Sequence, residues 1–308
     1  MLIDTDAGVD DALAIFYGMH SPEVRVEAIT TVAGNVEVEK CTRNVKTILQ
    51  YARSEYRPVI VQGSGRPLRK ELITAPEVHG KDGLGNTQRS ITKSNSRESH
   101  EAMECIRHCC EQFSQRLVIV ALGPLTNIAR VLKKYPRSLR KVRQIVSMGG
   151  AFRVPGNTGP VAEFNYFVDP DAAHVVLQSG LPLTIVPLDV TEQLILMRSH
   201  LRNHIGKHRT KWASFLYEFT GNYMQYHKRT LGFEGGYLHD PIAMAIAVRP
   251  SLARVRKVHV EVECRSKLTR GMTVADFRIP GKGSMPDVVV EIDQDKFLEL
   301  FHKRVLAD

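Results

Sequence analysis

The feature that most constrains the fold is the alternation of apolar runs with helical stretches over the first two-thirds of the chain. These runs occupy residues 24–34, 57–63, 115–124, 142–150 and 181–189. Short apolar strands without in/out alternation, separated by helices, are typical of a parallel sheet covered on both faces. The sequence therefore predicts an α/β fold: an open, mostly parallel, twisted sheet with helices on both faces.

The pattern changes near the end of the chain. Residues 255–292 are rich in strand-like segments, and a last short helix follows them. No linker composition and no internal repeat divides the chain, so we predict a single domain over residues 1–308 with a peripheral β-rich segment at 255–292. The polar stretch 83–101 has no periodicity, and we predict a loop there.

Composition and charge argue against several classes of protein. No run approaches the ~18 apolar residues of a membrane-spanning helix, and no charged-then-apolar leader opens the chain. The five cysteines are interpreted as buried, reduced thiols. We therefore predict a cytoplasmic protein with no membrane partner. The formal charge is +9, but the basic clusters at 133–143 and 200–212 accompany no nucleic-acid motif, so we predict solvated helix faces and no nucleic-acid partner.

Polar or glycine-rich clusters follow the ends of four predicted strands. They lie at residues 4–6, 34–35, 122–127 and 147–150. In parallel sheets the functional groups gather beyond the carboxyl ends of the strands. We expect these four clusters to converge on one edge of the sheet.

The first cluster continues into a helix and is strongly acidic. Asp4, Asp6, Asp10 and Asp11 fall within eight positions. Asp10 and Asp11 could simply cap a helix and oppose its dipole, but this reading explains Asp4 and Asp6 poorly. Carboxylates at a strand end and at the next helix start suit a hard cation with oxygen ligands, such as Ca²⁺. Gly8 allows the tight turn that would bring the two groups together.

Two later segments carry compatible side chains. Asp240 stands beside His239 in "GGYLHDPIAMAIAV" (235–248), directly before an apolar helix, although "HDP" alone is weak evidence. Glu163 and Asn165 are separated by one residue, so in an extended segment they would point the same way. A carboxylate and an amide on one side suit hydrogen bonds to a polyhydroxy ligand such as a sugar.

In this order, the motifs resemble those of the inosine–uridine-preferring nucleoside hydrolase family nearly end to end. The family's signature D-x-D-P-G-x-D-D appears at residues 4–11, with Ala7 where proline is usual. The other matching segments are "TTVAGN" (30–35), "VHGKDGLGN" (78–86), "ALGPLTNIA" (121–129), "SMGGAF" (147–152), "GNTGPVAEFN" (156–165), "HDP" (239–241) and "TRGMTVADFR" (269–278).

The resemblance implies the family's open, mostly parallel sheet and a calcium ion. Its implied ligands are Asp6, Asp11, the main-chain carbonyl of Thr126, and Asp240. Asp10 matches the position that holds the ribose 2′-hydroxyl. The other implied sugar-binding positions are Asn35, Met148, Asn157, Glu163 and Asn165, and the implied nucleobase contacts are His79 and His239.

The implied function is hydrolysis of the N-glycosidic bond of ribonucleosides to ribose and free nucleobase, in purine and pyrimidine salvage. Calcium-bound water would attack C1′ with Asp6 as general base and inversion of configuration. His239, with an unperturbed pKa near 6.5, would be the leaving-group acid. Related enzymes are homodimers or homotetramers, so we expect a homo-oligomer.

Several alternatives stay open at this stage. His239 could cap its helix, His79 could be structural, and Tyr226 and Tyr223 could form an ordinary amphipathic helix face or contact the base. Asp-x-Asp also occurs in haloacid-dehalogenase-type phosphatases, and a nucleoside-binding protein without catalysis would keep the same pocket. The sequence does not fix the preferred base. Trp212, the only tryptophan, lies away from the motifs and favours the broader or pyrimidine-tolerant branch.

Overall fold

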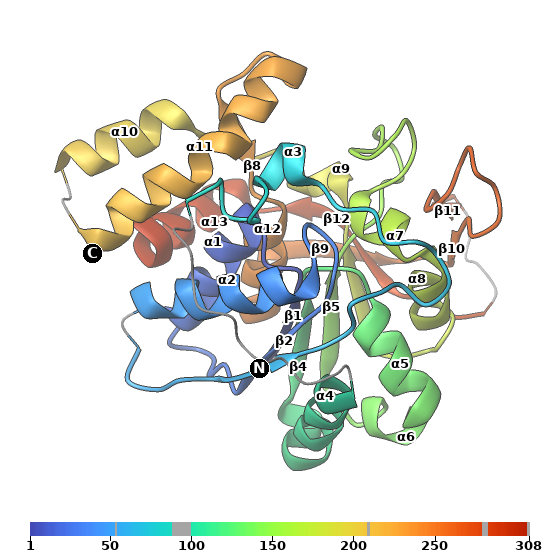
Figure 1. Cartoon of the computed structure of the whole chain (residues 1–308). Coiled ribbons are helices and arrows are strands. Elements are labelled where there is room, and N and C mark those ends of the chain that lie inside the picture. The colour runs from blue at the N-terminus through green and yellow to red at the C-terminus, as the bar shows by residue number, and fades with distance from the viewer. Residues whose placement is uncertain (53, 88–99, 208–209, 279–282, 307–308) are drawn as a thin grey trace.

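A computed structural model describes residues 1–52, 54–87, 100–207, 210–278 and 283–306. Its centre is an eight-stranded sheet in the order β3-β2-β1-β4-β5-β6-β12-β9 (Figure 1). The strands are β1 (Leu2–Thr5), β2 (Ala28–Thr31), β3 (Val59–Gln62), β4 (Val118–Ala121), β5 (Gln144–Met148), β6 (Leu183–Val186), β9 (Ala253–Lys257) and β12 (Asp287–Ile292). All neighbours in this order are parallel except β12 and β9. The predicted mostly parallel sheet is confirmed.

Helices cover both faces of the sheet, as predicted. Successive residues of one strand belong to different cores: Ile3 packs in one buried cluster and Leu2 in the other. The first cluster includes α1 (Val9–Met19), α2 (Val38–Tyr51), α11 (Lys211–Leu231), α12 (His239–Val248) and α13 (Gln294–Phe301). The second includes α4 (His100–Phe113), α5 (Thr126–Lys134) and α8 (Pro170–Leu177). Burial on two faces explains why the strands read as continuous apolar runs.

The remaining elements lie at the margins of the sheet. In Figure 1, α10 (Arg198–Lys207) lies beside α11 at one side of the molecule, and β10 (Val260–Val262) and β11 (Thr273–Ala275) lie at the opposite side. The other short elements are α3 (Pro76–His79), α6 (Pro136–Leu139), α7 (Phe164–Val168), α9 (Leu188–Thr191), β7 (Ile195–Met197), β8 (Gly235–Tyr237), 3₁₀ turns at Ser114–Arg116 and Pro250–Leu252, and a π turn at His302–Leu306.

The strand-rich segment 255–292 divides between two sheets. β12 joins the central sheet beside β6, with β9 at the edge, whereas β10 and β11 form a separate antiparallel pair. The assignment of the whole chain to a single domain stays a prediction. The polar stretch 83–101, predicted as a loop, lies mostly outside the described residues. Among the described helices, none combines the length and the apolar character that crossing a membrane requires.

The topology brings the ends of distant strands together. β1 pairs with β2 on one side and β4 on the other, and β4 pairs with β5, all in the same direction. The segments that follow their carboxyl ends therefore meet at one edge of the sheet. α12 packs closely against α1, which brings residue 240 to the acidic segment near residue 10.

Candidate active site

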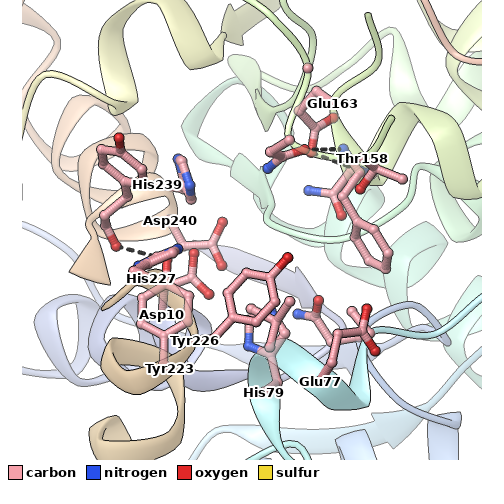
Figure 2. A pocket seen from close by; sticks show the side chains of 18 of the residues that line it. Asp10, Glu77, His79, Thr158, Glu163, Tyr223, Tyr226, His227, His239 and Asp240 are labelled. Carbon is pink, nitrogen blue, oxygen red and sulfur yellow. Dashed lines mark hydrogen bonds between the residues drawn. The ribbon is translucent and has the colours of Figure 1, made fainter. Parts of the chain in front are cut away.

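A cavity of about 560 Å³ opens at this edge of the sheet. It is lined by every residue predicted to contact substrate and by one predicted metal ligand: Asp10, Asn35, His79, Met148, Asn157, Glu163, Asn165, Tyr226, His239 and Asp240. Figure 2 shows Asp10 and Asp240 side by side, with Glu163 and Thr158 across the cavity from them. The predicted ligands Asp6, Asp11 and Thr126 do not line the cavity and are buried.

Three carboxylates meet where Asp10 and Asp240 line the cavity, with Asp11 buried behind them. Asp10 and Asp11 open α1, Asp240 lies in the first turn of α12, and one oxygen of each lies within 4.8 Å of the others. All three are buried. Burial and then the charge of Asp11 raise the pKa of Asp10 to about 8, and burial and the neighbouring aspartates raise the pKa of Asp240. Three crowded, buried oxygen donors fit a hard divalent cation.

Asp6 lies close to these carboxylates but is held separately. Its Oδ2 accepts a hydrogen bond from the backbone N–H of Asn35 at 2.7 Å. Its Oδ1 is buried and has no hydrogen-bond partner among the described residues. Asp4 Oδ2 and Asp171 Oδ2 are also buried without a partner among the described residues, but Asp6 Oδ1 is the one that belongs to the aspartates around Asp11, where a bound ion or a catalytic role would explain it. Burial and the charge of Asp11 raise the pKa of Asp6 well above its usual range.

Two glycines make room for the Asp6 carboxylate. A Cβ on Gly34 would lie 2.1 Å from Asp6 Oδ2, and one on Gly123 would lie 2.8 Å from Asp6 Oδ1. Gly34 follows β2 and Gly123 follows β4, so both belong to the polar clusters that the sequence places at strand ends. Any other residue at these positions would displace the carboxylate.

Hydrogen bonds fix the orientation of Asp11. Its Oδ1 accepts from the Thr5 hydroxyl, and its Oδ2 accepts from the backbone N–H of Gly8 at 2.8 Å and from Asn35 Nδ2 at 3.1 Å. Ala7, in the turn between Thr5 and Gly8, has a φ of +29°. Proline fixes φ near −65°, so the residue usual at this position in the family would require a different turn.

Asp4 belongs to a different environment from the other three aspartates of the cluster. Its Oδ1 accepts hydrogen bonds from the Thr30 hydroxyl at 2.5 Å and from Asn127 Nδ2 at 2.8 Å. It lies within β1 and does not line the cavity. Burial raises its pKa to about 6. Asp4 therefore joins neighbouring segments of the sheet and does not belong to the group of carboxylates around Asp11.

The opposite wall presents amide and carboxylate oxygens. Glu163 caps the start of α7 and accepts hydrogen bonds from the backbone N–H groups of Gly150, Asn165 and Tyr166 at 3.1, 2.7 and 3.1 Å. Burial nevertheless raises its pKa to about 7. Asn165 donates its Nδ2 to the carbonyls of Leu122 and Met148 at 2.6 and 3.2 Å, which leaves its Oδ1 to accept.

The end of the cavity next to α11 and α12 is lined by histidines and tyrosines. His79 Nδ1 accepts from the Val9 backbone N–H at 3.1 Å, and His239 Nδ1 lies 2.7 Å from the Thr191 hydroxyl. Burial, followed by the charge of neighbouring histidines, lowers the pKa of both to about 3. Both imidazoles are therefore neutral at pH 7, which does not favour the protonated form that the predicted acid role of His239 requires.

The lining residues that the sequence did not single out include Glu77, Glu192, His227 and Tyr237. His227 lies four positions after Tyr223 and next to Tyr226, so helical periodicity could have placed it on the same face of α11. Its Nδ1 donates to the Gly235 carbonyl at 3.0 Å, since that carbonyl can only accept. Glu192 follows α9 and Tyr237 ends β8, and neither belongs to a motif that would have marked it.

Comparison with known proteins gives one consistent family. A family model described as inosine-uridine preferring nucleoside hydrolase matches residues 1–299. The pyrimidine-specific ribonucleoside hydrolase RihA of Salmonella enteritidis is 37% identical over 309 residues, which are 99% of this chain and 97% of that protein.

Solved structures agree with this result. A plant nucleoside hydrolase superposes with a TM-score of 0.90 at 34% identity, covering 100% of this chain and 98% of the other. A purine-preferring ribonucleoside hydrolase from Gardnerella vaginalis superposes with a TM-score of 0.90 at 32% identity, covering 99% and 97%. The names of these similar proteins include both a pyrimidine-specific and a purine-preferring enzyme, so similarity alone does not indicate which base this chain prefers.

Proposed function

This chain belongs to the inosine-uridine preferring nucleoside hydrolase family and is a hydrolase of N-glycosyl bonds, and we propose that it cleaves ribonucleosides to ribose and free nucleobase. The observation that carries the proposal is the convergence of Asp10, Asp11 and Asp240 within 4.8 Å beside a cavity of about 560 Å³. The opposite wall offers the carboxylate and amide oxygens that a sugar diol requires.

The cofactor we propose is Ca²⁺, held by Asp6, Asp11, Asp240 and the main-chain carbonyl of Thr126. The unpartnered Oδ1 of Asp6 and the close approach of Asp11 and Asp240 support this ligand set. Thr126 begins α5, and its hydroxyl is already committed to Asp169 at 2.7 Å, so only its carbonyl remains for this role. A bound ion would lower the pKa of a coordinated water and hold two ribose hydroxyls.

Asp6 is the general base in this proposal. The Asn35 backbone N–H fixes Oδ2 of Asp6. Oδ1, the oxygen assigned to the ion, keeps a further lone pair that would accept a proton from the attacking water. Because water attacks C1′ directly, the product should be ribose with inverted configuration at C1′. Loss of Asp6 should therefore affect every riboside equally, whatever its base.

Ribose is held from both walls of the cavity. We propose that the Asp10 carboxylate accepts a hydrogen bond from the ribose 2′-hydroxyl and that Oδ1 of Asn165 accepts one from another ribose hydroxyl. The remaining sugar contacts are assigned to Asn35, Met148, Asn157 and Glu163, all of which line the cavity. Asn157 is oriented by the Phe164 backbone N–H, which donates to its Oδ1 at 2.9 Å and leaves its amide N–H groups available.

The nucleobase would lie between His79, His239 and Tyr226. We propose that His239 contacts the departing base. Burial lowers its pKa, so the imidazole is neutral at pH 7 before substrate binds. A neutral imidazole can still donate one hydrogen bond to a ring nitrogen or carbonyl of the base. Full proton transfer would require substrate binding to raise the pKa of His239 from about 3.

The test is a panel of inosine, uridine, cytidine, adenosine and guanosine with calcium or with EGTA, read by release of free ribose. We expect hydrolysis with calcium, loss of activity with EGTA, and almost no activity in Asp6→Ala on any substrate. Binding without ribose release would favour a catalytically inactive nucleoside-binding protein. Phosphate release from phosphate esters with Mg²⁺ would favour a phosphatase. Light scattering tests the expected homodimer or homotetramer.

A further inference from the structure

A second hollow, of about 450 Å³, lies against a different face of α11 from the proposed active site. Its described lining residues are Gly85, Arg198, Tyr217, Gly221, Asn222, Gln225, Arg229 and Glu234, and none of them lines the first cavity. Protein cavities of this size bind small molecules. The lining is mostly polar and includes two guanidinium groups, which favour a negatively charged ligand.

The positive charges of this hollow lack close counter-ions. Glu234 is the one carboxylate among the described lining residues, and it already pairs with Lys228 at 3.3 Å. Neither Arg198 nor Arg229 forms an ion pair with another described residue. Two guanidinium groups beside one engaged carboxylate give an excess of positive charge that attracts anions.

Arg198, the first residue of α10, is held in place and partly removed from water. It is half-buried, and its Nη1 donates to the Tyr217 carbonyl at 2.5 Å and to the Thr220 hydroxyl at 3.1 Å. Its Nη2 has no hydrogen-bond partner among the described residues. Burial lowers the pKa of Arg198, and the charge of Arg202 acts in the same direction. An anion bound at Nη2 would offset both effects.

Gly221 leaves the space in front of this guanidinium open. It lies in the interior of the 21-residue helix α11, where glycine is less favourable than alanine. A Cβ at this position would meet one atom outside its own helix within 4 Å, Arg198 Nη2 at 3.6 Å. Alanine would therefore fit, so packing does not require the glycine. Its effect is to leave Nη2 uncovered toward the hollow.

Gln225 and Arg229 extend the same side of α11. Positions 221, 225 and 229 are four residues apart and therefore lie on one face of the helix. Gln225 and Arg229 are exposed, and their side chains make no hydrogen bond with another described residue. A planar guanidinium presents paired N–H donors that match two oxygens of a phosphate group, and an amide can add a further donor.

We propose that this hollow is a binding site for a phosphate dianion, carried by a small phosphate monoester or free in solution, with Arg198 and Arg229 as its principal donors. Binding here requires neither calcium nor ribonucleoside cleavage, so the inference goes beyond the proposed function. The Gly85 backbone N–H donates to the His79 carbonyl at 2.8 Å. A ligand in the hollow would therefore lie next to the segment that carries a lining residue of the active-site cavity.

The test is isothermal titration calorimetry in EGTA at pH 8 and 0.15 M KCl, with glucose 6-phosphate, inorganic phosphate or glucose as the probe. At pH 8 both phosphate probes are mainly dianions, and this salt concentration screens non-specific attraction. The proteins are wild type, Arg229→Gln, Gly221→Glu and Arg137→Gln. Arg137 is an exposed residue of α6, on the other side of the molecule (Figure 1), so its variant controls for the loss of one positive charge. Circular dichroism checks that all variants fold.

We expect saturable one-site binding of a phosphate probe to wild type and no binding of glucose. Kd should rise at least fivefold in Arg229→Gln, and binding should be lost in Gly221→Glu, whose carboxylate would take the place of the anion beside Arg198. Arg137→Gln should bind as wild type does. Tighter binding of glucose 6-phosphate than of inorganic phosphate would identify a monoester as the ligand, and the reverse order would identify free phosphate. No saturable binding of either phosphate probe, or equal Kd values in Arg229→Gln and Arg137→Gln, would overturn the inference.

Discussion

The crowded carboxylates should make the metal-free protein less stable as the pH rises. Burial and Asp11 raise the pKa of Asp10 from 3.8 to about 8. Between these two values the folded protein keeps a proton that the unfolded chain releases. The unfolded state therefore binds fewer protons, and the free energy of unfolding falls with pH by ~1.4 kcal/mol per pH unit. From pH 5 to pH 8 the Asp10 contribution amounts to about 4 kcal/mol as an upper limit.

Asp10→Asn tests this magnitude because the amide keeps the shape of the carboxyl group but cannot ionise. Urea unfolding in EGTA at pH 5, 6, 7 and 8 gives the free energy of unfolding for each protein. The free energy of unfolding of Asp10→Asn should exceed that of wild type by an amount that grows from pH 5 to pH 8, up to the limit of about 4 kcal/mol. Asp295→Asn, the same change at an exposed position of α13, should follow the wild-type profile.

Calcium should reverse the trend in wild type. Metal binding requires ionised carboxylates, so the stabilisation by calcium should increase with pH. The reasoning would be refuted if wild type and Asp10→Asn kept a constant difference in EGTA between pH 5 and pH 8. That result would mean that the Asp10 carboxyl titrates normally in the folded protein and does not share a buried site with Asp11.

Three further perturbations test other parts of the site. Gly123→Ala should lower calcium affinity, measured by calorimetry, at least tenfold, because the added Cβ would lie 2.8 Å from Asp6 Oδ1. The control Gly206→Ala places its Cβ in open space and should bind calcium as wild type does. Equal affinities would argue against Asp6 as a ligand. His239→Ala should lose about 10²–10⁴ in kcat/KM with inosine and far less with an aryl riboside whose leaving group needs no proton; similar losses on both would exclude the acid role. Removing calcium from a solution in which its free concentration is about 100 times Kd should lower the free energy of unfolding by ~2.7 kcal/mol. A thermal scan should then show Tm lower by about 5 °C, and an unchanged Tm would contradict a stabilising ion.

Local signals were sufficient for the architecture. Apolar runs such as 115–124 and 181–189 contain β4 and β6, and the amphipathic stretch 36–52 contains α2. Both signals are short-range: side-chain periodicity reports burial, and glycine or proline marks where an element ends. The segment 255–292 was harder to interpret, because pairing of β12 with β6 joins residues about a hundred positions apart. No local pattern reports which strand a segment will pair with.

The sequence by itself determined that this chain folds as a mostly parallel α/β sheet and that the polar clusters at 4–6, 34–35, 122–127 and 147–150 gather at one edge. It could do so because the ends of parallel strands necessarily share an edge. Only the tertiary structure decided which carboxylates converge: Asp10 joins Asp11 and Asp240 within 4.8 Å, while Asp4 is turned away to Thr30 and Asn127. The tertiary structure also decided that burial lowers the pKa of His239 to about 3 and that Glu192 lines the cavity with no partner among the residues the structure describes. Protonation and charge balance depend on burial and on neighbours from distant segments, and the packing of the whole chain sets both.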